Sequence, residues 1–122
     1  MPQSFARLCI HLVFSTKHRE PLLHDTIRPD LHAYMATVLK NIACPALIIN
    51  SVEDHVHILL DLSRTNSISS AVEHVKKTSS KWIKTQNEAL AGFAWQAGYG
   101  AFAVSESNIS AVRKSARTSS ES

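Results

Sequence analysis

Residues 53–62 read EDHVHILLDL, and this stretch decides how the middle of the chain folds. Within it, Val56 and Ile58 alternate with His55 and His57, which is the period-two pattern of a strand that buries one face. Because side chains two residues apart point to the same side of a strand, the two imidazoles are expected next to each other. The stretch therefore predicts a β-strand with a pair of histidines on one face and core residues on the other.

Other strand-like and helix-like segments surround this strand. An apolar run at 45–52, joined to it by a two-residue acidic turn, predicts a β-hairpin. Further strands are expected at 8–15 and, as one bulged strand or two short ones, at 93–105; helices are expected at about 27–42, at 67–86 and from residue 109. The order β-α-β-β-α-β predicts an α+β fold, a ferredoxin- or RRM-like split βαβ sandwich whose helices pack on one face of an antiparallel sheet.

The composition fits a single domain in the cytoplasm. With 122 residues, 44% of them hydrophobic, the chain can bury a core without disulfides. It has no apolar run long enough to span a membrane and no secretory leader, so no membrane partner is expected. Cys9 and Cys44 lack the spacing of a zinc site and fit buried thiols. The net charge of +3 mildly favours a polyanionic partner.

The histidine pair allows two interpretations from the residues alone. Two neutral imidazoles on one rigid face can supply two ligands to a divalent metal ion. Equally, they can be polar residues on the solvated side of an amphipathic strand. A histidine-triad phosphohydrolase is disfavoured, because Leu59 stands where a third alternating histidine would be. The other histidines have no partner at metal-ligand spacing and are expected to be surface or satisfied core residues: His11, His18, His24, His32 and His74.

Four segments, taken in order, carry a resemblance to a known family. They read HLVFSTKHREPLL at 11–23, DHVHILLDL at 54–62, SISSAVEHVKKTSSKWI at 67–83 and FAWQAGYGAFAVSES at 93–107. Together they resemble the HUH-type one-tyrosine transposases, the IS200-like group that includes the REP-associated tyrosine transposases. The resemblance extends over about residues 8–112, which is nearly the whole chain.

The resemblance implies a DNA-binding protein of single-stranded DNA transposition. In that family the H-x-H pair binds Mg²⁺ or Mn²⁺, and a tyrosine cleaves DNA at hairpin ends through a 5′-phosphotyrosine that is later rejoined. The family's proteins are homodimers. Carried over to this sequence, His55 and His57 become the metal ligands. Basic residues on the matching segments become candidate DNA contacts: Lys17, Arg19, Lys76, Lys77 and Lys81. For the three lysines of the second helix, an ordinary solvated face stays an equal alternative.

The sequence departs from the family near its C-terminal end. The family's tyrosine nucleophile, and a glutamine four residues after it, correspond by spacing to Ser115 and Ser119. Tyr34 and Tyr99 are expected to be packing residues and not substitutes for the nucleophile. The resemblance therefore implies a transposase that has lost cleavage.

These observations predict a transposase domain at residues 1–113 and a disordered or frayed tail at 114–122. A frameshift near Lys114 would explain the tail, because RTSS is what codons for Ala-Asn-Gln-Gln give when they are read one base late. Two alternatives stay open. One is a domesticated or decayed member of the family that only binds hairpin DNA, and the other is an unrelated small α+β domain without DNA affinity.

Overall fold

Two strands, β1 (Cys9–Ser15) and β3 (His55–Asp61), form the centre of a four-stranded sheet. β2 (Ala46–Ser51) lies on the outer side of β3 and β4 (Gly100–Val104) on the outer side of β1, so the order is β2-β3-β1-β4. The computed structural model describes residues 8–104, and the strand pairs within them are all antiparallel. The sheet is therefore the one that the order of the elements predicted.

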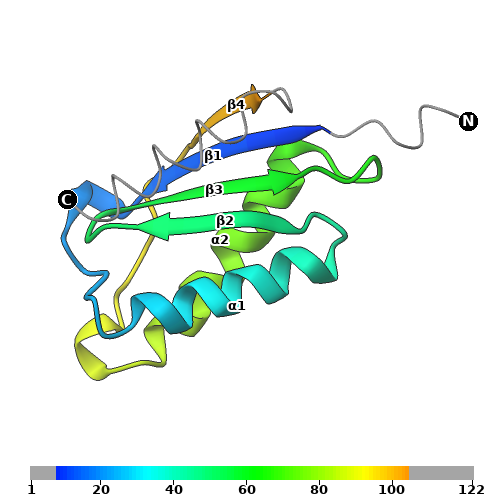
Figure 1. Cartoon of the computed structure of the whole chain (residues 1–122). Helices are drawn as coiled ribbons and strands as arrows, with labels where there is room; N and C mark the ends of the chain where they lie inside the picture. Colours follow the sequence, from blue (N-terminus) through cyan, green and yellow to red (C-terminus); the bar gives the residue numbers. More distant parts are fainter. Residues whose placement is uncertain (1–7, 105–122) are drawn as a thin grey trace, which may run out of the picture.

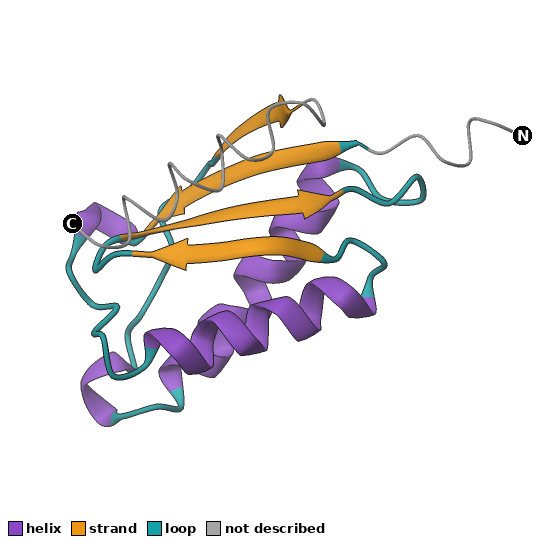
Figure 2. Cartoon of the chain, viewed as in Figure 1, coloured by secondary structure: helices purple, strands orange, loops and turns teal. Residues whose placement is uncertain are grey.

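The two long helices, α1 (Arg28–Asn41) and α2 (Ile68–Lys84), cover the same face of this sheet (Figure 1, Figure 2). Two one-turn helices, η2 (Lys17–Arg19) and η3 (Glu88–Leu90), lie in the connections after β1 and after α2. The predicted α+β sandwich is confirmed. Its other face, away from α1 and α2, is the face on which the histidine pair lies.

Alternate side chains of the two central strands form the core beneath the helices. Each of them is at most 3% exposed: Ile10, Leu12, Phe14, Val56, Ile58 and Leu60. The residues between them point the other way, and there His55 and His57 are half-buried. One departure from simple alternation is Leu59, which is 1% exposed although it shares the face of the histidines. The period-two pattern thus predicted the strand and its orientation correctly.

α2 begins at a residue that caps it. The Ser67 hydroxyl accepts a hydrogen bond from the Ser70 N–H at 3.1 Å. The preceding Asn66 donates from its side-chain amide to the Ile42 carbonyl at 2.9 Å, just past the end of α1. Two adjacent residues therefore start α2 and tie it to α1.

The aromatic segment that begins at residue 93 contacts the sheet through one strand, β4, and an isolated bridge before it, where one bulged strand or two short strands were predicted. Trp95 forms an isolated bridge with Thr16, and β4 then pairs with β1. The Trp95 ring makes T-shaped contacts with Phe14 and Phe93 at centroid distances of 4.7 and 4.9 Å. Its indole N–H donates to the hydroxyl of the buried Ser79 of α2 at 3.1 Å. The segment is thereby fixed to both the sheet and α2.

Some expectations concern parts of the chain beyond these elements. The helix expected from residue 109 and the tail expected at 114–122 lie outside the described residues, so the domain boundary at residue 113 stays a prediction. Within residues 8–104, none of the helices is long and apolar enough to cross a membrane.

Removing the Ser79 hydroxyl should destabilise the protein, because the Trp95 indole N–H would lose its acceptor. We expect Ser79→Ala to lower the free energy of unfolding by about 1–2 kcal/mol in urea denaturation. In a Trp95→Phe background, which has no indole N–H, the same substitution should cost clearly less. Equal costs in the two backgrounds would show that this hydrogen bond contributes nothing to stability.

Candidate functional site

Three histidines lie in a row on the sheet face opposite the helices. His55 and His57 come from β3, and His11 comes from the neighbouring β1. The ring centroids of His55 and His57 are 4.9 Å apart, and those of His57 and His11 are 5.4 Å apart. The β1–β3 register, which pairs Val13 with His57, brings His11 to the pair from 46 residues away. The sequence spacing, which gave His11 no partner, therefore did not reveal this contact.

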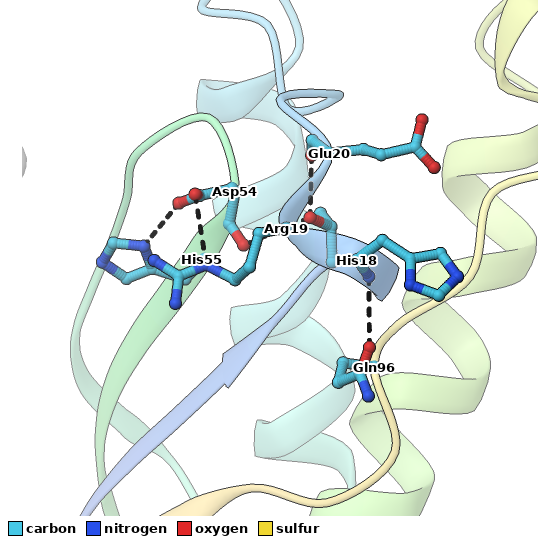
Figure 3. A network of polar contacts seen from close by, with 7 residues as sticks. His18, Arg19, Glu20, Asp54, His55 and Gln96 are labelled. Carbon is cyan, nitrogen blue, oxygen red and sulfur yellow. Dashed lines mark hydrogen bonds and ion pairs between the residues drawn. The ribbon is translucent and has the colours of Figure 1, made fainter.

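The carboxylate of the preceding residue holds the His55 ring. Nδ1 of His55 lies 2.7 Å from Oδ1 of Asp54, whose Oδ2 lies 3.2 Å from Nε of Arg19 (Figure 3). Burial alone would raise the pKa of Asp54, but the hydrogen bonds from His55 and Arg19, with their charges, outweigh burial and lower it. Asp54 is thus ionised at neutral pH and can only accept. In neutral His55 the proton is therefore on Nδ1 and the lone pair on Nε2.

The turn that carries Arg19 has an unusual backbone. His18 and Arg19 have φ values of 59° and 56°, in the left-handed region that residues other than glycine rarely adopt. The His18 N–H donates to the side-chain oxygen of Gln96 at 3.1 Å, and the Thr16 hydroxyl donates to the Glu20 carbonyl at 2.7 Å (Figure 3). Such a conformation costs on the order of 1–3 kcal/mol per residue. In this turn, the left-handed conformation places the Arg19 guanidinium beside the histidine pair.

His57 has one ring nitrogen hydrogen-bonded and the other buried. Its Nδ1 lies 3.2 Å from Nε2 of His11, whereas its Nε2 has no hydrogen-bond partner among residues 8–104. Burial, followed by the charges of His55 and His11, lowers the pKa of His57 to about 4. The ring is therefore neutral at physiological pH, as a metal ligand must be. This environment disfavours the interpretation of His57 as a solvated surface residue.

The histidine pair opens onto a cavity of about 380 Å³, here called the histidine pocket. The sheet forms one side of it, and the loop before β4 forms another. Its polar and loop lining includes Arg19, His55, His57, Gln96, Gly98 and Tyr99. A guanidinium and two imidazoles thus face one space, which suits an anion such as a phosphate bound beside a metal ion.

Lys76 of α2 anchors the loop that forms this wall. Its Nζ donates to the carbonyl oxygens of Gln96 at 2.7 Å and Gly98 at 2.9 Å, and it lies 5.8 Å from the centroid of the Phe14 ring. Burial lowers the pKa of Lys76. Gly98 has a φ of 87°, which a residue with a side chain would adopt only under strain. Two of the three N–H groups of the Lys76 ammonium therefore bind the loop that forms the pocket wall.

A second cavity, of about 460 Å³, lies on the α2 side of the same loop and is called the helix pocket below. Lys77 lines it, and it shares Gly98 and Tyr99 with the histidine pocket. Tyr99 is 43% exposed, so the prediction that it is a packing residue is wrong. Tyr34 packs against the core and stacks on Trp82 at a centroid distance of 5.7 Å, as predicted.

The structure separates the predicted metal and DNA contacts. The histidine pocket contains three of them, namely His55, His57 and Arg19. Lys76 and Lys77 both line the helix pocket, and Lys76 is also the loop anchor. Lys17 and Lys81 are exposed and lie outside both pockets. Ser115, at the position of the family's tyrosine, lies outside the described residues.

The histidine pair does not by itself complete a metal site. Within residues 8–104, no group of three His, Cys, Asp or Glu side chains could hold a metal ion. Asp54 is adjacent to the pair, but both of its oxygens already accept hydrogen bonds. An ion on the two imidazoles would therefore need further ligands from outside residues 8–104, such as water or the oxygens of a bound molecule.

Sequence reasoning missed His11 as a part of this site and did not assign a role to Asp54. A signal for Asp54 was present, because a carboxylate directly before a histidine can fix the ring through Nδ1. His11 gave a weaker signal. His11 occupies an odd-numbered position of the first strand, on the face opposite to the core residues Ile10 and Leu12. Only the strand order brings it to the pair.

Comparisons with known proteins agree with the fold. A family model described as transposase IS200 like matches residues 4–115. The structure is similar to a candidate transposase from Deinococcus radiodurans R1, with a TM-score of 0.73 and 20% identity over 93% of this chain and 91% of that one. It is also similar to a REP-associated tyrosine transposase bound to a REP hairpin, with a TM-score of 0.63 and 16% identity. That alignment covers 89% of this chain and 62% of the other. A search of curated protein sequences finds no match.

The stability of the metal-free protein should fall as the pH decreases from about 6.5 to about 4. Unfolded His57 takes up a proton near its ordinary pKa of 6.5, but folded His57 does so only near 4, so unfolding binds a proton in this window. The lost stability should be on the order of 2 kcal/mol, because the partly exposed ring is screened by water. Urea denaturation at several pH values measures it.

His57→Gln is the matched variant, because it removes this one ring and keeps the other histidines. Its stability should decline less steeply over the same window. Parallel curves for the two proteins would contradict the depressed pKa of His57.

Proposed function

The chain belongs to the IS200-like transposase family, and from this we propose that it binds hairpin or single-stranded DNA and uses His55 and His57 as ligands of Mg²⁺ or Mn²⁺. One observation carries the proposal. The two imidazoles line the same pocket as the Arg19 guanidinium, and each has its Nδ1 engaged in a hydrogen bond. That arrangement leaves their Nε2 atoms for a ligand in the pocket.

The residues present fit a divalent metal ion. Nε2 of His57 is buried and unpaired within residues 8–104, and a metal–nitrogen bond would remove the cost of that unsatisfied atom. Mn²⁺ accepts imidazole ligands more readily than Mg²⁺, so the pair should favour Mn²⁺. When bound, the ion supplies Lewis-acid polarisation of a scissile phosphodiester. With only two ligands among residues 8–104, we expect its affinity to be weak until DNA is bound.

Cationic side chains around the two pockets support DNA as the partner. The Nε–H of Arg19 donates a hydrogen bond to Asp54. The other four N–H groups of its guanidinium can bind phosphate oxygens at the histidine pocket. Lys77 provides a charge at the helix pocket. A strand that passes from one pocket to the other would cross Tyr99, whose exposed ring can stack on a base. The REP-associated transposase of similar fold was solved with a hairpin.

Cleavage is the step that we propose this chain has lost. In the mechanism that the family resemblance implies, a tyrosine oxygen bonds to phosphorus and the 3′-oxygen of the DNA leaves. Ser115 stands at the position of that tyrosine. The chain would then keep the metal ligands and the DNA surface of the family without its nucleophile. The domain boundary at residue 113, a homodimeric state and a cytoplasmic location belong to the same proposal.

A second candidate function is that of a decayed or domesticated binder, which occupies hairpins and mixes into dimers with an intact relative. Serine at both 115 and 119 favours it, because neither the nucleophile nor the glutamine of the family is then present. The gene sequence tests the proposed origin. A frameshift near Lys114 requires that another reading frame beyond codon 113 encode a tyrosine and a glutamine.

Binding of a labelled DNA hairpin should weaken with salt, and Lys77→Ala should reduce the slope of log affinity against log salt by about one unit. Lys40→Ala is the control, because Lys40 is an exposed lysine on α1 that lines neither pocket. Its slope should equal that of the unmodified protein. Filter binding at several salt concentrations measures both slopes. Complete absence of binding at low salt would contradict the proposed function and favour an unrelated α+β domain.

Incubation with a hairpin and Mn²⁺ should yield no covalent protein–DNA adduct, because no tyrosine stands at the nucleophile position. Denaturing gel electrophoresis followed by mass spectrometry is the measurement. An adduct would overturn the loss of cleavage. Tyr99→Phe would then show whether the exposed tyrosine of the histidine pocket had replaced the missing one.

A further inference from the structure

We propose that His11 is a positioning residue of the histidine pocket: its Nε2 accepts a hydrogen bond from Nδ1–H of His57 and so keeps the Nε2 lone pair of His57 directed at a metal ion. The inference rests on the proposed function in one respect, that His57 is a metal ligand. It adds a third histidine, on another strand, to the pair that the H-x-H motif contains.

The contact between the two rings is direct. Nε2 of His11 and Nδ1 of His57 are 3.2 Å apart, within hydrogen-bond distance, and the rings are stacked with an interplanar angle of 26°. Both side chains come from the central strand pair, in which His11 stands opposite Leu59, the residue two positions after His57. The backbone ladder between β1 and β3 therefore fixes where the two rings meet.

The direction of this hydrogen bond decides what Nε2 of His57 can do. A neutral imidazole has one N–H donor and one acceptor nitrogen. If His11 donated, His57 would carry its proton on Nε2, as a buried donor without a partner among residues 8–104 and without a lone pair for a metal ion. If His57 donates, its Nε2 keeps a lone pair that can bind a metal ion. Metal-binding histidines almost always donate their other ring N–H in this way.

His55 shows the same arrangement with a different acceptor. Its Nδ1 lies 2.7 Å from the Asp54 carboxylate, which can only accept. The two neighbouring imidazoles would thus have the same tautomer, one set by the adjacent residue and the other by a residue of the next strand. Both would offer Nε2 to the same pocket.

His11 itself does not fit the role of a third ligand. Its Nε2 faces His57, and it is not among the residues that line the histidine pocket. The described residues also contain no group of three potential ligands. We therefore assign it to orientation of His57 and not to metal coordination.

Two measurements on the full chain test the inference. Long-range ¹H–¹⁵N spectra of the metal-free protein report which nitrogen of His57 carries the proton, and the signal of free Mn²⁺ in electron paramagnetic resonance reports binding. The variants are His11→Leu, which removes the acceptor, and His11→Gln, whose amide oxygen can still accept. His32→Gln is the matched control, because His32 is another partly buried histidine with a side-chain hydrogen bond, to Ser51 at 2.7 Å.

We expect His57 in the Nδ1–H form in the unmodified protein, in His11→Gln and in His32→Gln. In His11→Leu, the Nε2–H form should appear and the Mn²⁺ affinity should fall by about 10- to 100-fold, as it does when supporting residues of metal ligands are removed. His11→Gln should stay within a few-fold of the unmodified protein. His57 in the Nε2–H form in the unmodified protein would overturn the inference, even if His11→Leu failed to fold.

Failure of the inference differs from failure of the proposed function. Mn²⁺ binding that is lost in His57→Gln but unchanged in His11→Leu would overturn the positioning role alone. Mn²⁺ binding unchanged in both His55→Gln and His57→Gln would overturn the metal site of the proposed function, and the positioning role with it.

Discussion

The pairing of β1 with β3 is the constraint on which the rest of the structure depends. These strands form the centre of the sheet, and their ladder runs from Cys9 opposite Asp61 to Ser15 opposite His55. One face of the ladder supplies the core beneath α1 and α2, and the other carries the histidines. Because a slip of one residue would exchange the faces of a strand, burial of the aliphatic side chains also fixes the position of the imidazoles. The stability of the core and the geometry of the site are thus set by the same hydrogen bonds.

Around this ladder, the site combines groups in opposite electrostatic states. Asp54 and Arg19 form an ion pair at the exposed end of β3, while His57, two residues into the strand, is neutral because its ring is buried. The histidine pocket is therefore lined by both a charged guanidinium and a neutral imidazole. This combination suits a site that a negatively charged molecule enters from solvent.

Local patterns predicted most of the fold and only half of the site. Hydrophobic periodicity located both helices and the hairpin, because burial of one face leaves its period in the sequence. The H-x-H spacing placed His55 beside His57 for the same reason. His11 could not be placed, since its contact with His57 spans 46 residues and depends on which strands become neighbours. Lys76 was predicted as a phosphate contact because it lies on the helix that matches the family's segment, yet its ammonium group binds the carbonyls of a loop whose path no local pattern reveals. Tyr99 was misjudged for the same reason, since it belongs to that loop.

The loop anchored by Lys76 also makes the two pockets dependent on each other. Gly98 and Tyr99 line both cavities, so the loop is a common partition and not the wall of one alone. A molecule that shifts this partition from the side of α2 changes the space left beside the histidines, and one that fills the histidine pocket changes the space beside α2. Thermodynamic linkage then requires the effect to be equal in both directions: whatever free energy an occupant of one pocket adds to or removes from binding in the other, it receives in return.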